Sequence, residues 1–425
     1  MKRENVLKFL EFSLYYEQDS YSVTCRLFSS PICIEIPSTY LGKPVTRVDF
    51  QAFAGCSSLT SIVIPNSVTS IGSYAFEGCT SLKSIAIPNS VTYIGNSAFS
   101  HCTSLTSIVI PDSVTSIGDS AFWGCTSLTS INIPDSVPSI DGYVFWGCTS
   151  LTSIEIPDSV RSIGASSFSG CSSLTSINVN DGNSNYSSID GVLYNKKETT
   201  LINYPSAKLK SVFVIPNSVT EIGISAFKDC ISLKSIVIPN SVTYIGGYAF
   251  EGCTSLTSIE IPDSVTSIGG YTFQNFSSLK SIVIPNSVTE IGIFAFSQCT
   301  SLTSIVIPDS VTSIGDSAFW GCTSLESIVI PKSVTSIYND AFSQCTSLTS
   351  INVNDDSFFY SSIDGVLYNK SIKTLIDYPC AKSGKIFVIP DSVTSIGRYA
   401  FSGCSFLTSI EIPEGVISID YETFN

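Results

Sequence analysis

The sequence predicts a solenoid of mostly β structure, whose coils of about 23 residues stack in register around a parallel β-sheet face. A unit of the form L-T-S-I-x-I-P-x-S-V-T-x-I-G-x-x-A-F-x-G-C-T-S recurs along nearly the whole chain of 425 residues. A fixed period of this length is typical of repeat proteins in which each unit stacks only on its neighbours. The period is visible in one phenylalanine per unit: Phe53, Phe76, Phe99, Phe122, Phe145, Phe168, Phe227, Phe250, Phe273, Phe296, Phe319, Phe342, Phe401 and Phe424.

The first half of each unit has the pattern of a strand. In the unit at 59–81, Leu59, Ile62 and Ile64 follow the L-x-x-L-x-L spacing of a leucine-rich repeat. Because side chains alternate along a strand, Ile62 and Ile64 are expected to face inward and Val63 outward. Pro65 then ends the strand, since it has no N–H to donate to a neighbouring strand.

The second half of the unit returns the chain to the start of the next coil. A second extended stretch closes at Gly72, and residues 73–78 are expected to form a short helical turn that carries Phe76 inward. One coil buries too little to offset the cost of ordering it, whereas an inner coil is covered on both sides. The predicted fold class is therefore a right-handed leucine-rich-repeat solenoid, of α/β type but mostly β.

The predicted organisation is an N-terminal cap at 1–32 and a solenoid at 33–425, interrupted by irregular repeats at about 180–210 and 354–384. The two interruptions match each other at a constant offset along the chain, which indicates duplication of a larger block. Asp190-Gly191 and its counterpart Asp364-Gly365 stand between apolar stretches and predict tight hairpins. We expect a small β-meander at each place, which serves either as a decorated coil that relieves strain or as a lateral recognition knob.

Composition excludes several classes of function. The net charge of −14 argues against nucleic acid as a partner, because phosphate binding needs clustered lysine and arginine. Apolar residues are scattered at short intervals, so no segment is expected to insert into a membrane. Lys8 and Glu11 interrupt the apolar run at the N-terminus, so a cleaved secretion signal is not expected there.

The cysteines and the single histidine have structural explanations. Twelve of the fifteen cysteines recur at one position of the unit, where Phe276 also occurs, so this position is expected to hold buried, reduced thiols. We expect no metal and no cofactor, because no C-x-x-C or histidine set is present. His101 takes a position that other units fill with Gly, Asn or Asp, which predicts a turn. Cys25, Cys33 and Cys380 lie off this pattern, and their pairing stays open.

Two sets of residues are candidates for protein binding. The first is an outward row of the strand face, which is uncharged and apolar for most of its length but is equally explained by strand propensity. The second consists of tryptophans that follow the core phenylalanine and are expected to be exposed, as at interaction hot spots. The candidates are Trp123, Trp146, Trp320, Val63, Val109, Asn132, Glu155, Val283, Val306 and Val329.

The repeat I-P-x-S-V-T-x-I-G-x-x-A-F-x-G-C-x-S-L, with the inserted Y-S-S-I-D-G-V-L-Y-N-K segment, closely resembles the BspA-like leucine-rich-repeat family over about residues 33–425. The resemblance implies a cell-surface or secreted adhesin that binds extracellular-matrix proteins or other cells. The alternative is a cytoplasmic interaction scaffold. An enzyme is not expected, because no nucleophile–base pair, metal set or phosphate loop is evident. Ligand and oligomeric state stay open.

Overall fold

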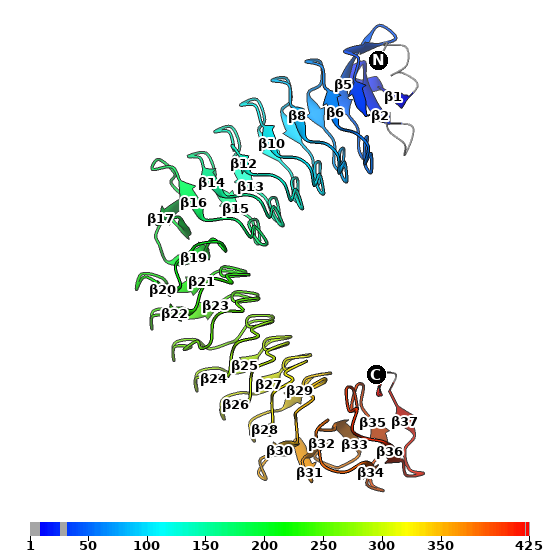
Figure 1. Cartoon of the computed structure of the whole chain (residues 1–425), viewed down its shortest axis with the longest axis vertical. Helices are drawn as coiled ribbons and strands as arrows, with labels where there is room; N and C mark the ends of the chain where they lie inside the picture. The colour runs from blue at the N-terminus through cyan, green and yellow to red at the C-terminus, as the bar shows by residue number, and fades with distance from the viewer. Residues whose placement is uncertain (1–8, 26–31, 421, 425) are drawn as a thin grey trace. The chain divides into compact units, whose positions relative to one another are not determined.

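The computed structural model describes residues 9–25, 32–420 and 422–424, and they are nearly all β-sheet and turn (Figure 1). A short 3-10 helix, η2 (Tyr16–Gln18), is the one helix that lies wholly within them. The chain divides into two compact units, Met1–Lys208 and Leu209–Asn425, and each is a stack of coils. The predicted β solenoid and its coil length are confirmed, since Thr69 Oγ1 donates to Thr46 O and Thr92 Oγ1 to Thr69 O at the period of the repeat. Residues 1–8 and 26–31 of the predicted cap lie outside the described residues.

In the first unit the coils form two rows of parallel strands. The first strand row contains β3 (Cys33–Glu35), β6 (Ser61–Val63), β8 (Ser84–Ala86), β10 (Ser107–Val109), β12 (Ser130–Ile131), β14 (Ser153–Ile156) and β16 (Ser176–Val179). The second strand row contains β5 (Lys43–Val48), β7 (Ser70–Ile71), β9 (Tyr93–Ile94), β11 (Ser116–Ile117), β13 (Ser139–Ile140) and β15 (Ser162–Ile163). Each paired residue meets its equivalent one coil away, as Ile85 meets Ile108.

A hairpin covers the first edge of the second strand row. The strands β1 (Leu10–Tyr15) and β2 (Ser20–Cys25) pair antiparallel, and β2 pairs in parallel with β5. The two-residue strand β4 (Thr39–Tyr40) adds a further antiparallel pair to β5. Because an open strand edge presents unpaired N–H and C=O groups, this hairpin removes a site of edge-to-edge association. The exact limit of a cap at residue 32 stays a prediction.

The second unit repeats the two rows. Its first strand row contains β20 (Val212–Val214), β22 (Ser235–Val237), β24 (Ser281–Val283), β26 (Ser304–Val306), β28 (Ser327–Ile330), β30 (Ser350–Val353), β34 (Ile386–Val388) and β36 (Ser409–Glu411). Its second strand row contains β21 (Glu221–Ile222), β23 (Tyr244–Ile245), β25 (Glu290–Ile291), β27 (Ser313–Ile314), β29 (Ser336–Ile337), β35 (Ser395–Ile396) and β37 (Ser418–Ile419). The coil between β23 and β24 joins these rows through two isolated bridges, at Glu260 and Ile268.

The core of each unit is a column of stacked phenylalanine rings. Phe76 and Phe99 lie with ring centroids 5.3 Å apart and planes 5° from parallel, and both are fully buried. The inward isoleucines, leucines and valines of every coil surround this column. Since each ring is covered by the rings of the two neighbouring coils, an inner coil derives its stability from both.

The expected helical turn at residues 73–78 is wrong, because this segment forms a column of tight turns. Tyr74 and Gly78 adopt positive φ angles of 59° and 67°, which no α-helix contains. Some backbone amides of this segment bond to the next coil and others bond within the segment. Phe76 N–H donates to Ala98 O of the next coil at 2.8 Å, whereas Cys79 N–H donates to Phe76 O of its own coil at 3.1 Å. A helix would use all these amides locally and would leave the neighbouring coil without donors.

Close contact between coils explains the glycine of the I-G pair. A Cβ atom at Gly95 would lie 2.4 Å from the backbone nitrogen of Ser73 in the preceding coil. The same crowding by preceding backbone exists at Gly72 and Gly246. Glycine avoids this clash, although Asp141 and Tyr338 occupy the same position in two other units.

The cysteines of the repeat are buried, as predicted, and they bond to the backbone. Cys79 Sγ donates to Phe53 O of the preceding coil at 3.1 Å, and burial raises the pKa of this thiol to about 12. The same bond recurs at Cys102, Cys125, Cys148, Cys171, Cys253, Cys299, Cys322 and Cys345. Cys404 departs from the prediction, since it is only half-buried. Off the repeat position, Cys25 is half-buried, Cys33 is exposed and Cys380 is buried.

Both predicted meanders are present. In the first unit β17 (Tyr186–Ile189), β18 (Val192–Asn195) and β19 (Thr200–Asn203) pair antiparallel. In the second, β31 (Tyr360–Ile363), β32 (Val366–Asn369) and β33 (Thr374–Asp377) do the same. The turn at Asp190-Gly191 has positive φ at both residues, and Gly191 O accepts from Ile177 N–H of β16 at 2.9 Å. Each meander therefore covers a strand edge of the first row.

Two serines of neighbouring units, Ser100 and Ser113, differ in whether their hydroxyl groups are hydrogen-bonded. Ser100 is buried and its hydroxyl has no hydrogen-bond partner among the described residues, whereas Ser113 Oγ donates to Val91 O at 2.7 Å. Because an unsatisfied buried hydroxyl costs about 1–3 kcal/mol, Ser100→Ala is expected to raise the free energy of unfolding by about 1 kcal/mol. Ser113→Ala is expected to lower it by about 1 kcal/mol. Urea unfolding of both variants checks this, and shifts of the same sign would contradict it.

Candidate functional site

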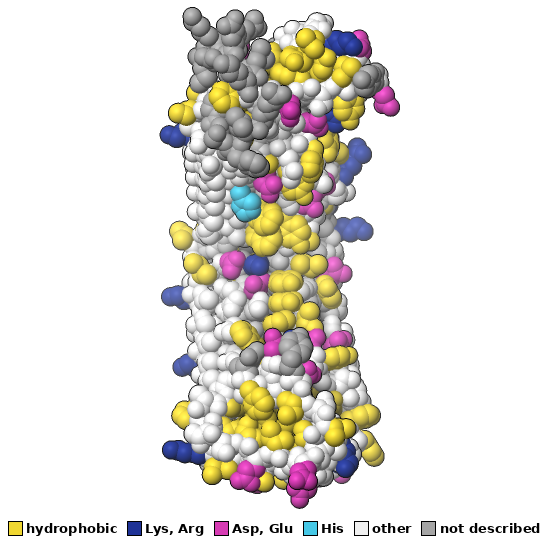
Figure 2. Space-filling model, turned by 90° about the vertical axis from the view of Figure 1, so that its right-hand side faces the viewer, with side chains coloured by type: hydrophobic (Ala, Val, Ile, Leu, Met, Phe, Trp, Pro, Cys, Tyr) yellow, Lys and Arg dark blue, Asp and Glu magenta, His cyan; other side chains and the backbone are white. Residues whose placement is uncertain are grey.

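The first unit carries a group of aromatic side chains on its turn column, which we call the aromatic strip: His101, Trp123, Tyr143 and Trp146. The indole rings of Trp123 and Trp146 stack with centroids 5.5 Å apart and planes 10° from parallel. Tyr143 lies against Trp146 at 5.2 Å, and the His101 ring lies 5.0 Å from Trp123. Figure 2 shows this histidine (cyan) beside a hydrophobic patch (yellow). The strip is the one place in the first unit where two tryptophans meet.

The tryptophans are less exposed than predicted. Trp123 is 36% exposed, as expected, but Trp146 and Trp320 are half-buried. The Trp146 ring lies against those of Trp123 and Tyr143, which cover part of its surface. Trp320 lines a hollow together with Phe294 and Tyr399. The stacked faces of Trp123 and Trp146 are thus turned toward each other, whereas Trp320 borders an open space.

His101 is the turn residue that the sequence predicts, with φ at 56°. Its side chain has a further role, because it lies over Gly124, where a Cβ atom would be 2.7 Å from His101 Nδ1. Sequence reasoning missed the contact with Trp123. In the turn column His101 N–H donates to Trp123 O, the residue before its equivalent Gly124 in the next coil. The strand rows show the same one-residue offset of a parallel ladder, since Gly95 N–H donates to Ile71 O, the residue before its equivalent Gly72.

The outward row of the strand face lies where the sequence places it. Val283 is 77% exposed and pairs in register with Val306, which is equally exposed. The remaining members, Val63, Val109, Asn132, Glu155 and Val329, are also exposed. Exposure agrees with a binding role and equally with strand propensity, so the role of this row stays a prediction.

A second column of aromatic rings was missed by sequence reasoning. Tyr248 and Tyr271 stack at 4.4 Å, and Phe294 continues the column at 4.9 Å from Tyr271. All three stand two residues before a core phenylalanine and have positive φ. The signal was present as aromatic residues at the same position of three successive units.

Two carboxyl groups with raised pKa values, those of Asp340 and Asp377, line one cavity beside the second meander. Burial raises the pKa of Asp377 well above its ordinary value, and burial together with the nearby Asp316 and Glu422 raises the pKa of Asp340 to about 6. Sequence analysis did not single out either residue. A comparison of the two duplicated blocks could have found them, because the residues of the first block that correspond to Asp340 and Asp377 are the uncharged Ser166 and Asn203.

Within the described ranges, no group of three or more His, Cys, Asp or Glu side chains is arranged to hold a metal ion. A helix with the length and hydropathy of a membrane span is likewise not found in the described part of the chain.

The raised pKa values predict how stability depends on pH. The pKa of Asp340 is 3.8 in the unfolded chain and about 6 in the folded one, so the unfolded chain loses its proton first as pH rises. The folded state therefore becomes progressively less stable between these two pH values. Asp340→Ser with Asp377→Asn removes both groups, so the variant is expected to gain stability over the wild type as pH rises from about 4 to 6, and further above it. Urea unfolding between pH 4 and 8 measures this difference. A difference that is constant with pH would contradict the assignment.

Comparison with known proteins agrees with this architecture. The model of the BspA type leucine rich repeat region matches residues 23–152, 94–212, 204–322, 277–383 and 378–425. A leucine rich cell surface protein from Faecalibacterium prausnitzii is 35% identical, with 81% of this chain and 93% of that chain covered and a TM-score of 0.61.

Two further crystal structures share the fold. A leucine-rich repeat protein from Eubacterium ventriosum is 23% identical over 99% of this chain and 93% of its own, with a TM-score of 0.57. The pneumococcal vaccine antigen PcpA is 22% identical over 82% of this chain and 92% of its own, with a TM-score of 0.62. No curated protein matches the chain. Because the repeat model matches nearly the full length, the chain belongs to the BspA-type leucine-rich-repeat family.

Proposed function

We propose that this chain is a cell-surface or secreted adhesion protein that binds extracellular-matrix proteins or proteins of other cells, without catalysis. The observation that carries the proposal is the aromatic strip, in which Trp123 and Trp146 stack on adjacent coils. Repetition does not require tryptophan at this position, since other coils place Ser100 or Ser169 there. The relative from Faecalibacterium prausnitzii, described as a cell surface protein, supports the location.

The arrangement of the rings favours a protein partner. Carbohydrate recognition by stacking needs an open ring face, but Trp123 and Trp146 stack face to face on each other, and the His101 ring lies beside Trp123. Exposed edges of rigid aromatic rings instead suit the pockets of a protein surface, where tryptophan and tyrosine are enriched at hot spots. The outward valine row provides a second apolar surface of the same chain.

The double variant Trp123→Ala with Trp146→Ala tests the proposal. Loss of both hot-spot side chains is expected to weaken binding to a matrix or cell-surface partner by at least about thirtyfold, as two contacts of ~1 kcal/mol or more each would give. Binding is measured by surface plasmon resonance against a panel of purified matrix proteins and intact cells.

Tyr93→Ser is the matched control for this variant. Tyr93 is an exposed aromatic residue of the second strand row, and its register partners Ser70 and Ser116 show that serine fits there. This control is expected to bind like the wild type. If the double variant also retained full binding, the aromatic strip would not be the adhesive surface.

An intracellular interaction scaffold is the second candidate. It is favoured by the cysteines, because Cys33 keeps an exposed thiol and the repeat cysteines donate to backbone carbonyls. Such thiols are typical of reducing compartments.

Protease treatment of intact cells of the source organism distinguishes the two locations. We expect an exported adhesin to be cleaved without lysis, while a cytoplasmic marker protein stays intact. Full protection of the chain under the same treatment would favour the scaffold.

A further inference from the structure

A cavity of about 190 Å³ lies beside the second meander. Three successive passes of the chain line it: Asp340 comes from the coil before the meander, Asp377 from β33, and Arg398 from the coil after it. Tyr338, which is 54% exposed, also lines the cavity and marks where it meets solvent. The cavity is well above the volume that a single water molecule needs.

The two carboxyl groups in this cavity lack partners. Asp377 is only 8% exposed, and no hydrogen bond to its carboxyl group contributes to its pKa among the described residues. Asp340 Oδ1 is buried and is equally without a hydrogen-bond partner in the described part of the chain. Buried carboxylates are normally paired with a cation or fully hydrogen-bonded, so this arrangement is incomplete as it stands.

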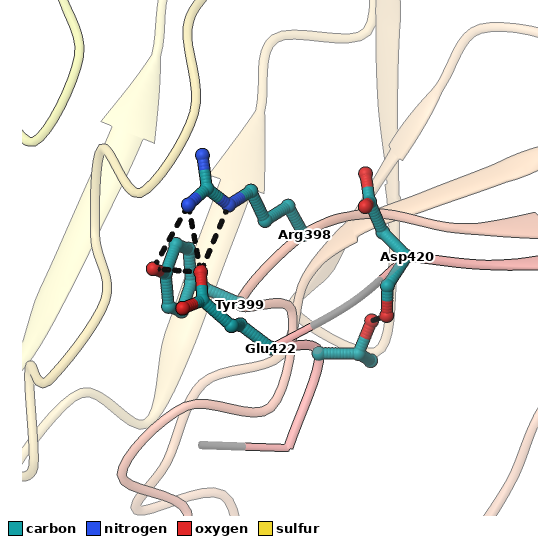
Figure 3. Close-up of polar contacts among 5 residues, drawn as sticks. Arg398, Tyr399, Asp420 and Glu422 are labelled. Carbon is teal, nitrogen blue, oxygen red and sulfur yellow. Dashed lines mark hydrogen bonds and ion pairs between the residues drawn. The ribbon is translucent and has the colours of Figure 1, made fainter.

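Burial outweighs the lowering effect of Arg398 on the pKa of Asp340, and the guanidinium group of Arg398 is turned toward Tyr399 and Glu422 (Figure 3). Arg398 Nη2 lies 2.7 Å from Glu422 Oε2 and donates to the Tyr399 hydroxyl at 3.1 Å, and Nε donates to Glu422 at 3.2 Å. The Tyr399 hydroxyl in turn donates to Glu422, and this bond is the main cause of the lowered pKa of Glu422. Among the described residues, the one cation that lines the cavity is thus engaged by Glu422.

An adjoining hollow of about 360 Å³ has three aromatic residues in its lining. Phe294, Trp320 and Tyr399 line it, and Asp340 belongs to both spaces. The hollow is open at this place because the meander-bearing coil lacks an outer turn, so that Gln344 Nε2 donates directly to Ser402 Oγ of the coil beyond at 2.8 Å. The apolar surface beside Trp320 therefore adjoins Asp340, through which the hollow borders the acidic cavity.

We propose that these two spaces bind a lysine side chain of a partner protein, with its ammonium group accepted by Asp340 and Asp377 and its alkyl stem against Trp320. The inference rests on the proposed function, for which it names the chemistry of a second contact. Lysine buries its methylene groups along apolar surface while its charged end reaches polar groups. A cation beside an indole ring gains a further attraction from the ring face.

The observations favour lysine over other cations. Calcium takes six to eight oxygen ligands, but the described residues hold no group of three or more candidate metal-binding side chains. A guanidinium group matches one carboxylate with a planar pair of donors, whereas Asp340 and Asp377 come from different coils. An ammonium group has three donors that rotate to reach separate acceptors.

Duplication supplies a control within the chain. The residues that correspond to Asp340 and Asp377 in the first block are Ser166 and Asn203. Substitution by these residues therefore introduces side chains that the same meander already accommodates elsewhere. We therefore expect lysine binding at the second meander and not at the first.

The test uses the full chain with Trp123→Ser and Trp146→Ser, in which Trp320 is the sole tryptophan. We expect its fluorescence to change saturably with the peptide acetyl-Gly-Lys-Gly-amide and not with acetyl-Gly-Gln-Gly-amide. Adding Asp377→Asn or Asp340→Ser is expected to weaken binding at least about tenfold, because each removes a charged hydrogen-bond acceptor. Asp391→Asn, at an exposed acid of the same unit, is the matched control and is expected to bind as before.

Three outcomes would overturn the proposal: equal response to the glutamine peptide, unchanged affinity in Asp377→Asn, or tighter binding of calcium chloride or the arginine peptide. Binding of n-butylammonium as tight as that of the lysine peptide would point to a free amine and away from a protein partner. Since the aromatic strip is already removed in this protein, failure here leaves the proposed adhesive function untouched. Loss of adhesion in the strip variants leaves the lysine site equally untouched.

Discussion

The structure depends on the hydrogen bonds that join each coil to the next. Strand rows pair equivalent residues of successive coils, and the turn column adds bonds such as Phe76 N–H to Ala98 O. These bonds hold coils at the spacing of neighbouring strands, about 4.8 Å. At this spacing there is no room for a Cβ at Gly95, and flat rings such as Phe76 and Phe99 are brought into contact. This spacing favours glycine at the first position and a flat aromatic ring at the second, although Asp141 and Tyr338 replace the glycine in two units.

Because coils lie this close together, substitutions at the same position of neighbouring units bring the new side chains into contact on the surface. A single tryptophan on a turn is an isolated side chain, but two at neighbouring coils become a stacked pair, as Trp123 and Trp146 do. Tyr248, Tyr271 and Phe294 show the same effect in the second unit. A repeat protein of this kind therefore acquires a binding surface by changing one position in adjacent units, without altering its core.

The meanders show how the stack accommodates an exception. Gly191 O accepts from Ile177 N–H, so the hairpin supplies the acceptor that a following coil would otherwise provide. In the second unit Tyr378 continues the aromatic column at 5.3 Å from Phe401, while the outer turn of its coil is missing. The core is thereby kept, and a cavity lined by Asp340 and Asp377 lies beside the meander.

The sequence by itself determined the period, the inward and outward faces of each strand, the hairpins at Asp190-Gly191 and Asp364-Gly365, and the turn at His101. These follow from local rules, since alternation and positive φ depend on few residues. Tertiary structure decided the rest: the turns in place of a helix, the contact of His101 with Trp123, the partial burial of Trp146, and the presence of Asp340 and Asp377 in one cavity. Each of these depends on contacts between coils, such as the bond from Phe76 N–H to Ala98 O, and no single unit contains both partners of such a contact.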